Sequence, residues 1–134
     1  IPKEYYSSII YWQEKRNNVK NLEEENIGYE NGVLGGLSTV LRALASRGDN
    51  ILVHSPTYVG FSRVLKNNGY NMILSNLYLD KDNIWRMDYE DMEKKITDNN
   101  IHLAIFCSPH NPSGRVWERE ELGKCYELVR KHKV

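Results

Sequence analysis

The segment Ser108–Gly114, which reads Ser-Pro-His-Asn-Pro-Ser-Gly, is the part of the chain best suited to chemistry. It follows directly on the apolar run Ile101–Cys107, which is typical of a strand covered on both faces. Two prolines and a glycine restrict the backbone of this loop, and Asn111 is its natural polar tip. The Asn111 amide is able to donate a hydrogen bond to a ligand oxygen. An isolated Asn-Pro pair is usually only a turn, so the interpretation depends on the whole heptapeptide in this position.

The segment Glu30–Leu37 carries three glycines at the expected start of a helix. Glycines there let the backbone approach an anion, and the free N–H groups together with the helix dipole bind phosphate. The alternative is that the glycines serve close helix packing, and the segment alone does not decide between the two. It contains neither GxGxxG nor GK[ST], which disfavours a dinucleotide site and a P-loop.

Tyr58 lies at the start of another expected helix, just after a predicted strand and the pair Ser55-Pro56. A tyrosine in this place is able to lay its ring against a flat aromatic ligand. Judged alone, the segment favours an ordinary half-buried tyrosine over a ligand contact.

The elements that position these segments follow from apolar periodicity and end signals. Helices are expected over about 3–17, 34–44 and 58–67, after Asp88 and from about Glu118; strands are expected over 51–54, 70–74 and 101–107. Alternating strands and helices predict an α/β fold, with three α/β/α layers and a mainly parallel sheet. Ligands bind beyond the carboxyl ends of the strands in such sheets, so the three segments should converge there.

Further predictions concern the segments between these helices and strands. Asn21–Asn26 reads as a polar linker, and a short extended piece is expected around Gly28. Gly48 is expected to cap the helix over 34–44, and Gly69 to end the helix over 58–67. Val134 falls where a further strand would begin, and a sheet that ended there would have an unprotected edge. We therefore expect residues 1–134 to be part of a longer domain, truncated at both ends.

Composition excludes several classes of protein. Eighteen basic residues balance eighteen acidic ones, which gives no support to a nucleic-acid partner or an anionic membrane. No apolar run approaches the roughly 20 residues that cross a bilayer, and the first residues do not resemble a signal peptide. Two cysteines, far apart, predict no disulfide framework, so a reduced, cytoplasmic protein is expected.

The remaining reactive side chains have plainer interpretations. Cys107 and His110 are three residues apart, but no third orienting group is visible, so a structural thiol is favoured. Ser108 with His110 fails as a triad for the same reason, and Cys125 lies on an apolar helix stripe. We expect no metal site, because three further histidines show no metal-ligand spacing and are read as structural or surface residues: His54, His102 and His132.

Four motifs in the correct order resemble the class I/II aminotransferases of fold type I, which use pyridoxal 5'-phosphate (PLP). They resemble most the branch of cystathionine β-lyase-like C–S lyases. That branch tends to show W-x-x-x-R, Y-x-x-G-V, P-x-Y-x-x-F and S-P-x-N-P-[ST]-G-x-V-W. Here these stand as Trp12–Arg16, Tyr29–Val33, Pro56–Phe61 and Ser108–Trp117. The resemblance runs essentially from end to end and implies part of the large, PLP-binding domain.

The resemblance also implies which residues hold the cofactor. The backbone N–H groups of Val33, Leu34 and Gly35 would bind its phosphate. Tyr58 would stack on the pyridine ring, and Asn111 would donate to the phenolic oxygen and favour its anionic form. These are expectations from the family, carried over only where the motifs match.

Other family features are expected outside the chain or in its backbone. The Schiff-base lysine, the aspartate that pairs with the pyridine nitrogen and the substrate-binding arginine would lie beyond Val134. We therefore expect no catalytic residue within the chain, and no activity from these 134 residues alone. The family also implies a cis peptide bond before Pro112 and, in some members, before Pro56.

The leading functional hypothesis is a carbon–sulfur β-lyase that acts on cystathionine or related cysteine conjugates, with a homodimeric parent protein. A class I/II aminotransferase is the first alternative, since both reactions begin by removing the same α-proton. A non-catalytic, effector-binding domain of aminotransferase type is another, and a DNA-binding domain upstream would favour it. A Rossmann-type nucleotide domain predicts a phosphate loop that is absent here.

Overall fold

The computed structural model describes all 134 residues, which divide into two compact units, Ile1–Gly32 and Val33–Val134. In the first unit, helix α1 (Lys3–Asn17) is followed by the short 3₁₀ helix η1 (Glu24–Asn26). The bounds of α1 are those predicted, but its expected apolar face is not buried, and Trp12 is 59% exposed. The three residues of η1 are too few to cover that face. The expected extended piece around Gly28 forms no strand.

The unit Val33–Val134 is built on three parallel strands in the order β2-β1-β5. His54 of β1 lies opposite Ser75 of β2, and Val53 lies opposite Ile105 of β5. None of the helices is long and apolar enough to cross a membrane. The elements are α2 (Val33–Leu44), β1 (Asn50–Ser55), α3 (Val59–Asn68), β2 (Asn71–Asn76), β3 (Tyr78–Leu79), β4 (Trp85–Arg86), α4 (Tyr89–Asp98), β5 (Leu103–Ile105) and α5 (Arg119–Lys131).

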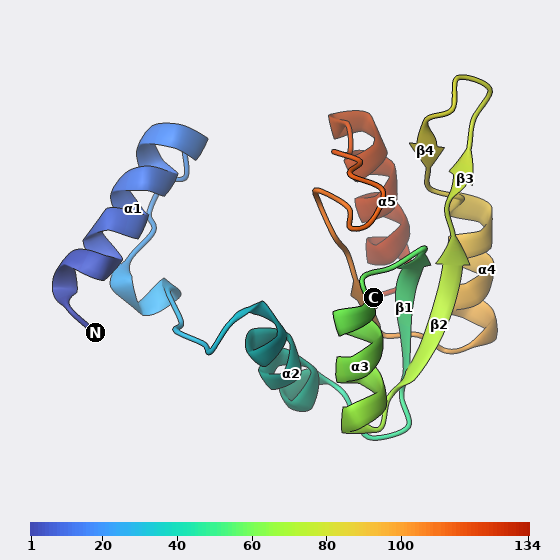
Figure 1. The fold of residues 1–134 in the computed structure, drawn as a ribbon, viewed down its shortest axis with the longest axis horizontal. Helices are drawn as coiled ribbons and strands as arrows, with labels where there is room; N and C mark the ends of the chain where they lie inside the picture. The colour runs from blue at the N-terminus through green and yellow to red at the C-terminus, as the bar shows by residue number, and fades with distance from the viewer. The chain divides into compact units, whose positions relative to one another are not determined.

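Side chains of β1 alternate between two apolar cores, one on each face of the sheet. Ile51 and Val53 pack with Leu41 of α2 and Leu65 of α3. On the opposite face, Leu52 belongs to a second core with buried side chains of α4 and α5. Figure 1 shows the sheet between α3 on one side and α4 on the other. The three-layer α/β/α prediction is therefore confirmed.

Several helix ends follow the sequence signals. Gly69 ends α3 in the left-handed region, with φ of 81°, as a glycine cap should. The Asp88 side chain accepts a hydrogen bond from the backbone N–H of Asp91 and caps α4. At the start of α5, Glu118 and Glu121 form a reciprocal capping box.

Two expectations about this unit are wrong. Gly48 does not cap α2, because the helix ends at Leu44; its positive φ of 92° instead serves the turn that leads into β1. The strand predicted over 101–107 is shorter, at Leu103–Ile105, and is not covered on both faces. It forms an edge of the sheet, and Phe106 just beyond it is 40% exposed.

The antiparallel hairpin β3–β4 has no counterpart in the sequence-based prediction. Its strands are two residues long, which is too short for a periodic pattern. The Asp80 side chain forms the turn by accepting hydrogen bonds from the backbone N–H groups of Asp82 and Ile84. It also pairs with Arg86 at 2.9 Å across the hairpin.

Candidate functional site

Two of the three predicted segments leave the sheet at the same edge. β1 and β5 are adjacent and parallel, so their carboxyl ends lie side by side. The turn to Tyr58 begins where β1 ends at Ser55, and the loop Ser108–Gly114 begins three residues after β5 ends at Ile105. The fold therefore brings the Tyr58 turn and the Asn111 loop to one edge, as the sequence predicted.

The third predicted segment is the start of α2, a helix that packs against α3. Near the end of α2, the Arg42 guanidinium donates to Asn68 Oδ1 at the end of α3, over 2.9 and 3.1 Å. Packing of Leu41 in α2 with Leu65 in α3 adds to this contact. That the start of α2 joins the other two segments at the carboxyl edge stays a prediction.

The loop Ser108–Gly114 holds Asn111 at an exposed position. The peptide bonds before Pro109 and Pro112 are both cis, as is the bond before Pro56. The expected cis bonds at Pro112 and Pro56 are confirmed, and the one at Pro109 was not predicted. The loop is closed by backbone bonds, from the His110 N–H to the Arg115 carbonyl at 2.8 Å and from the Gly114 N–H to the His110 carbonyl at 2.6 Å.

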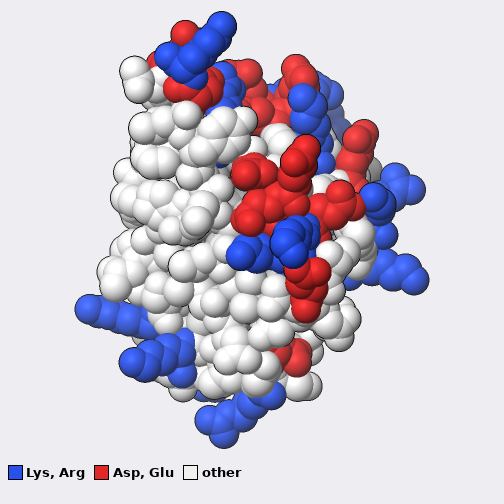
Figure 2. Space-filling view, turned by 90° about the vertical axis from the view of Figure 1, so that its right-hand side faces the viewer, with Lys and Arg blue, Asp and Glu red and all other residues white.

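Arg115 anchors the far end of the loop. Its side chain meets the Glu121 carboxylate at 2.6 Å and donates to the Trp85 carbonyl at 3.1 Å. Arg86 pairs with the same carboxylate at 2.9 Å and so ties the hairpin to the start of α5. Figure 2 views the molecule from the side of α4 and the hairpin and shows acidic side chains gathered around basic ones. The Asn111 loop is thereby attached to two further elements.

Tyr58 precedes the first residue of α3, and its side chain is partly exposed, at 37%. Its ring meets Phe61 edge to face, with the centroids 5.6 Å apart. A Cβ on Gly60 would lie 2.2 Å from the Tyr58 ring, so the ring occupies the space that only glycine leaves free. This role of Gly60 was not predicted, because the Tyr-x-Gly spacing is its only trace in the sequence.

The start of α2 is open to ligands. Val33, its first residue, is 81% exposed, and Leu34 and Gly35 are half-buried. Gly32 has a positive φ of 80°, which suits glycine and turns the chain into the helix. The first N–H groups of a helix have no partner within it, so they are free to bind an anion.

Two buried histidines lie under this edge. His54, at the end of β1, is 5% exposed, and burial lowers its pKa to about 4; nearby His110 lowers it further, and a backbone hydrogen bond at Ser75 opposes the shift. Burial also lowers the pKa of His110, against a hydrogen bond with the Pro56 backbone. Both rings pack on Trp117, with centroids 6.4 and 5.8 Å from it. The histidines are therefore uncharged parts of the scaffold at neutral pH.

The other side chains considered in the sequence take no part in this edge. Cys107 Sγ lies 3.2 Å from the Pro109 carbonyl oxygen, and no contact pairs it with His110. Cys125 is buried in the core, where burial raises the pKa of its thiol. His132 ends α5 and pairs with Glu93 at 2.7 Å. These contacts agree with the structural interpretation of Cys125 as a core residue.

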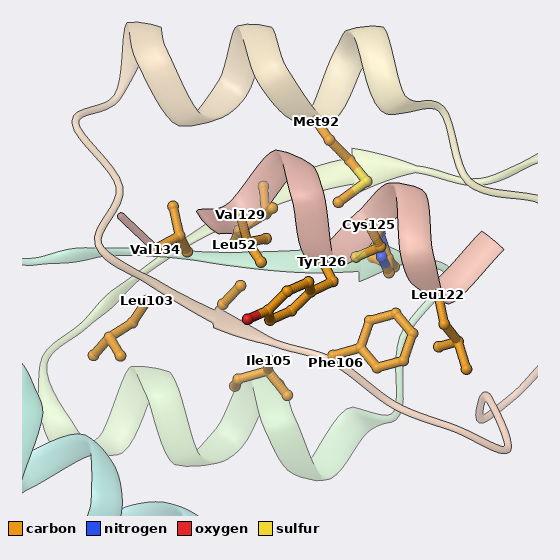
Figure 3. A pocket seen from close by; sticks show the side chains of 12 residues that line it. Leu52, Met92, Leu103, Ile105, Phe106, Leu122, Cys125, Tyr126, Val129 and Val134 are labelled. Atoms are coloured by element: carbon orange, nitrogen blue, oxygen red, sulfur yellow. The ribbon is translucent and has the colours of Figure 1, made fainter. Parts of the chain in front are cut away.

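An apolar groove lies apart from these residues. It has a volume of about 520 Å³ and runs between β5 and α5. Figure 3 shows Phe106, Tyr126 and Leu122 around it, together with Cys125 and Ile105. None of the five predicted cofactor-binding residues lines this groove. Its lining is mostly apolar, so it offers little polar chemistry.

The three predicted segments each suit one part of a flat, phosphorylated, aromatic ligand. An open helix start suits a phosphate, a partly exposed tyrosine ring suits an aromatic face, and an exposed amide suits a ring oxygen. Together they are able to bind and orient such a ligand.

Known proteins share this arrangement of sequence and fold. The chain matches the family model described as aminotransferase class I and II over residues 3–134. Cystathionine beta-lyase PatB from Bacillus subtilis is 40% identical over 127 residues, which cover 95% of this chain and 32% of that protein. Alanine aminotransferase from Mycobacterium tuberculosis is 32% identical over 104 residues, which cover 78% of this chain and 24% of that protein.

The fold of the chain is also similar to that of a solved structure. The PLP-bound C–S lyase from Staphylococcus hominis has a TM-score of 0.90 and 29% identity to this chain, and the match covers 100% of this chain and 34% of that one. The chain thus spans about a third of the length of the lyases that it matches.

Proposed function

The chain belongs to the class I and II aminotransferase family, and we propose that it forms the cofactor-binding part of a PLP enzyme. The observation that carries this proposal is the meeting of two sequence-distant segments, the turn to Tyr58 and the Asn111 loop, at one sheet edge. The exposed start of α2 is the third segment of the proposed site. The PLP found in the related C–S lyase structure supports the same cofactor here.

Each segment has a distinct proposed task. The backbone N–H groups of Val33, Leu34 and Gly35 bind the phosphate at the start of α2. The Tyr58 ring lies against the pyridine ring, where Gly60 leaves room for it. Asn111 donates to the phenolic oxygen and favours its anionic form. The cofactor, once bound, supplies an electron sink for the bonds at the substrate α-carbon.

The proposed reaction of the complete protein is β-elimination at a carbon–sulfur bond. The substrate is cystathionine or a related cysteine conjugate, and water completes its conversion to a thiol, pyruvate and ammonia. The 40% identity to a cystathionine beta-lyase over 127 residues supports this choice. Residues outside the chain would set substrate position, since the chain spans only about a third of that relative.

Product analysis of the complete protein tests this reaction. Purified protein with PLP and cystathionine, without any keto acid, should release homocysteine, pyruvate and ammonia in equal amounts. A lactate dehydrogenase assay measures the pyruvate, and a thiol reagent measures the homocysteine. If products form only after a keto acid is added, the lyase proposal is wrong and a transaminase is indicated.

An aminotransferase is the second candidate, and one observation favours it. Alanine aminotransferase shares 32% identity over 104 residues of this chain. Both reactions begin when the α-proton of the bound amino acid is removed, so the same cofactor-binding segments would serve a lyase or an aminotransferase. A keto acid product that carries the substrate's own carbon skeleton would identify this activity.

We also propose that residues 1–134 by themselves catalyse neither reaction. In the family that the chain resembles, the lysine that bonds to the cofactor lies in a segment that residues 1–134 do not match. The isolated chain, incubated with PLP and cystathionine, should release no pyruvate above the rate of PLP alone. Turnover at the rate of the complete protein would contradict the proposal.

A further inference from the structure

Arg115 closes the loop that presents Asn111. Its carbonyl accepts a hydrogen bond from the His110 N–H at 2.8 Å, and its own N–H donates to Ser113 Oγ at 3.3 Å. The His110 carbonyl in turn accepts from the Gly114 N–H at 2.6 Å. Asn111 is exposed and follows His110 directly, so its position depends on where the backbone of Arg115 is held.

The Arg115 side chain is held by two other elements. Its Nε donates to the Trp85 carbonyl of β4 at 3.1 Å, and its Nη2 donates to Glu121 Oε2 on α5 at 2.6 Å. Its guanidinium also lies over the Trp117 ring, 5.4 Å from the centroid. The side chains of Arg115 and Glu121 are only 14% and 12% exposed. A charged pair so well shielded from water is screened less than a pair on the surface.

Glu121 is the residue where these contacts meet. Its Oε2 also accepts from the Glu118 N–H at 2.8 Å, and its Oε1 pairs with Arg86 at 2.9 Å. Arg86 pairs further with Asp80 in the hairpin turn at 2.9 Å. Burial raises the pKa of the Glu121 carboxyl, but the Glu118 N–H and the two arginines lower it more, so its pKa lies below the usual value. The ionised carboxylate thus connects α5, the hairpin and the Asn111 loop.

Glu120, the preceding residue of α5, gives a direct comparison. Its side chain is 79% exposed and pairs with Lys124, one turn further along the helix, at 2.9 Å. Surface pairs of this kind add little to stability. The two neighbouring glutamates carry the same charge on the same helix, but the contact with Arg115 is made by Glu121.

We propose that Glu121 is a positioning residue, which sets the position of the Asn111 amide through Arg115. The inference rests on the proposed function, since Asn111 is the group that would donate to the phenolic oxygen of PLP. β5 ends at Ile105, well before Asn111, so the sheet alone does not fix the amide. The ion pair with α5 supplies a fixed point at the other end of the loop.

The variants E121A and E120A form a matched pair, because each replaces one glutamate of α5 by a good helix former. E121A removes the partner of Arg115, whereas E120A removes an exposed surface pair. R115K breaks the same contact and leaves the capping box of α5 intact, since lysine lacks the forked group that reaches Glu121 and Trp85 together. Melting temperatures identify a variant that fails to fold, and R115K then tests the proposal in place of E121A.

NMR spectra of the complete, cofactor-free protein provide the first test, which does not depend on any activity. Protein labelled with ¹⁵N in its asparagine side chains gives one pair of NH₂ signals for Asn111, which N111A identifies by their absence. We expect E121A and R115K to move these signals and E120A to leave them at the wild-type position. Unchanged Asn111 signals in E121A and R115K would overturn the positioning role, and so would equal changes in E120A and E121A.

The absorbance of the complete protein with bound PLP provides the second test. Because Asn111 is proposed to favour the anionic phenolic oxygen, N111A should raise the pH midpoint of the cofactor's absorbance change by about one unit. E121A should raise it by about half a unit, and E120A should leave it unchanged. A wild-type midpoint in E121A beside a raised one in N111A would overturn the positioning role alone. An unshifted midpoint in N111A would instead contradict the proposed function, and the Asn111 signals would still decide the role of Glu121.

Discussion

The Asn111 loop and the start of α2 are both proposed to contact PLP, but the protein holds them in different ways. The loop is fixed by side chains: His110 is 3% exposed and bonds to Ser113, and Arg115 ties the loop to Glu121. The start of α2 has no such support, because Val33 is 81% exposed. One segment is held by tertiary packing and the other by the helix itself.

This difference follows from the kind of group that each segment offers. Asn111 offers a side-chain amide, which has several rotamers and an irregular backbone beneath it, so its position must be set by neighbours. The start of α2 offers backbone N–H groups, whose direction is set by the helical dihedral angles alone. Changes under the loop should therefore affect stability, whereas changes at the start of α2 should affect binding only.

The largest effect is expected for W117A. Trp117 is 4% exposed, packs on His54 and His110, and donates to Cys107. Its loss removes a large buried side chain, so the free energy of unfolding should fall by about 3–5 kcal/mol. Urea denaturation measures this change, with the exposed neighbour V116A as control. A loss below about 1 kcal/mol would mean that the loop is not held by packing.

The next effect concerns pH and His54. Its pKa is lowered from 6.5 to about 4 by burial, so the folded protein binds this proton less readily than the unfolded chain. Stability is therefore complete above about pH 6.5, falls as the pH drops and levels off below about pH 4. The difference corresponds to about 3 kcal/mol over that range.

The variant H54L isolates this contribution from that of the carboxylates. Urea midpoints of H54L and wild type should differ in their dependence on pH between 7 and 4, with the wild type losing more stability. The exposed His102 serves as control in H102A, which should keep the wild-type dependence. Parallel curves for H54L and wild type would show that His54 is not a buried neutral ring.

A smaller effect on stability is expected for G60A. The new Cβ would lie 2.2 Å from the Tyr58 ring, so the ring must move, whereas alanine itself favours the helix. The free energy of unfolding should change by less than about 1 kcal/mol. The aromatic NMR signals of Tyr58 should shift nonetheless. G123A in α5 is the matched control, because no atom lies within 4 Å of its new Cβ.

The smallest effect on stability is expected for V33P. Proline is well tolerated at the first position of a helix, so the free energy of unfolding should change by less than about 0.5 kcal/mol. The substitution deletes one N–H group that is proposed to bind phosphate, so PLP affinity should fall about tenfold. V33A keeps that N–H and should bind normally. Equal affinities of V33P and V33A would remove the helix start from the site.

Much of the fold was predictable because local signals and tertiary structure agree. The bounds of α3 and α4 follow from apolar spacing together with Gly69 and Asp88 as end signals. The prediction that helices bury both faces of β5 was wrong. An apolar composition indicates a strand, but it does not show which elements pack on the faces of that strand. The hairpin β3–β4 depends on the Asp80 turn and the Arg86 pair, which have no periodic pattern.

The candidate site was predictable only in part for a related reason. Asn111 and Tyr58 lie in motifs with unusual composition directly after strands, so the sequence indicates them. His110 and Gly60 owe their roles to contacts with other side chains, with Ser113 for the first and the Tyr58 ring for the second. Such roles appear only when the packing is known.

The most direct test of the central claim is a crystal structure of the complete protein with PLP. We expect the phosphate on the N–H groups of Val33 and Leu34 and the pyridine ring against Tyr58. The phenolic oxygen should lie about 3 Å from the Asn111 amide nitrogen. A cofactor bound elsewhere, or one that leaves Asn111 without contact, would contradict the account.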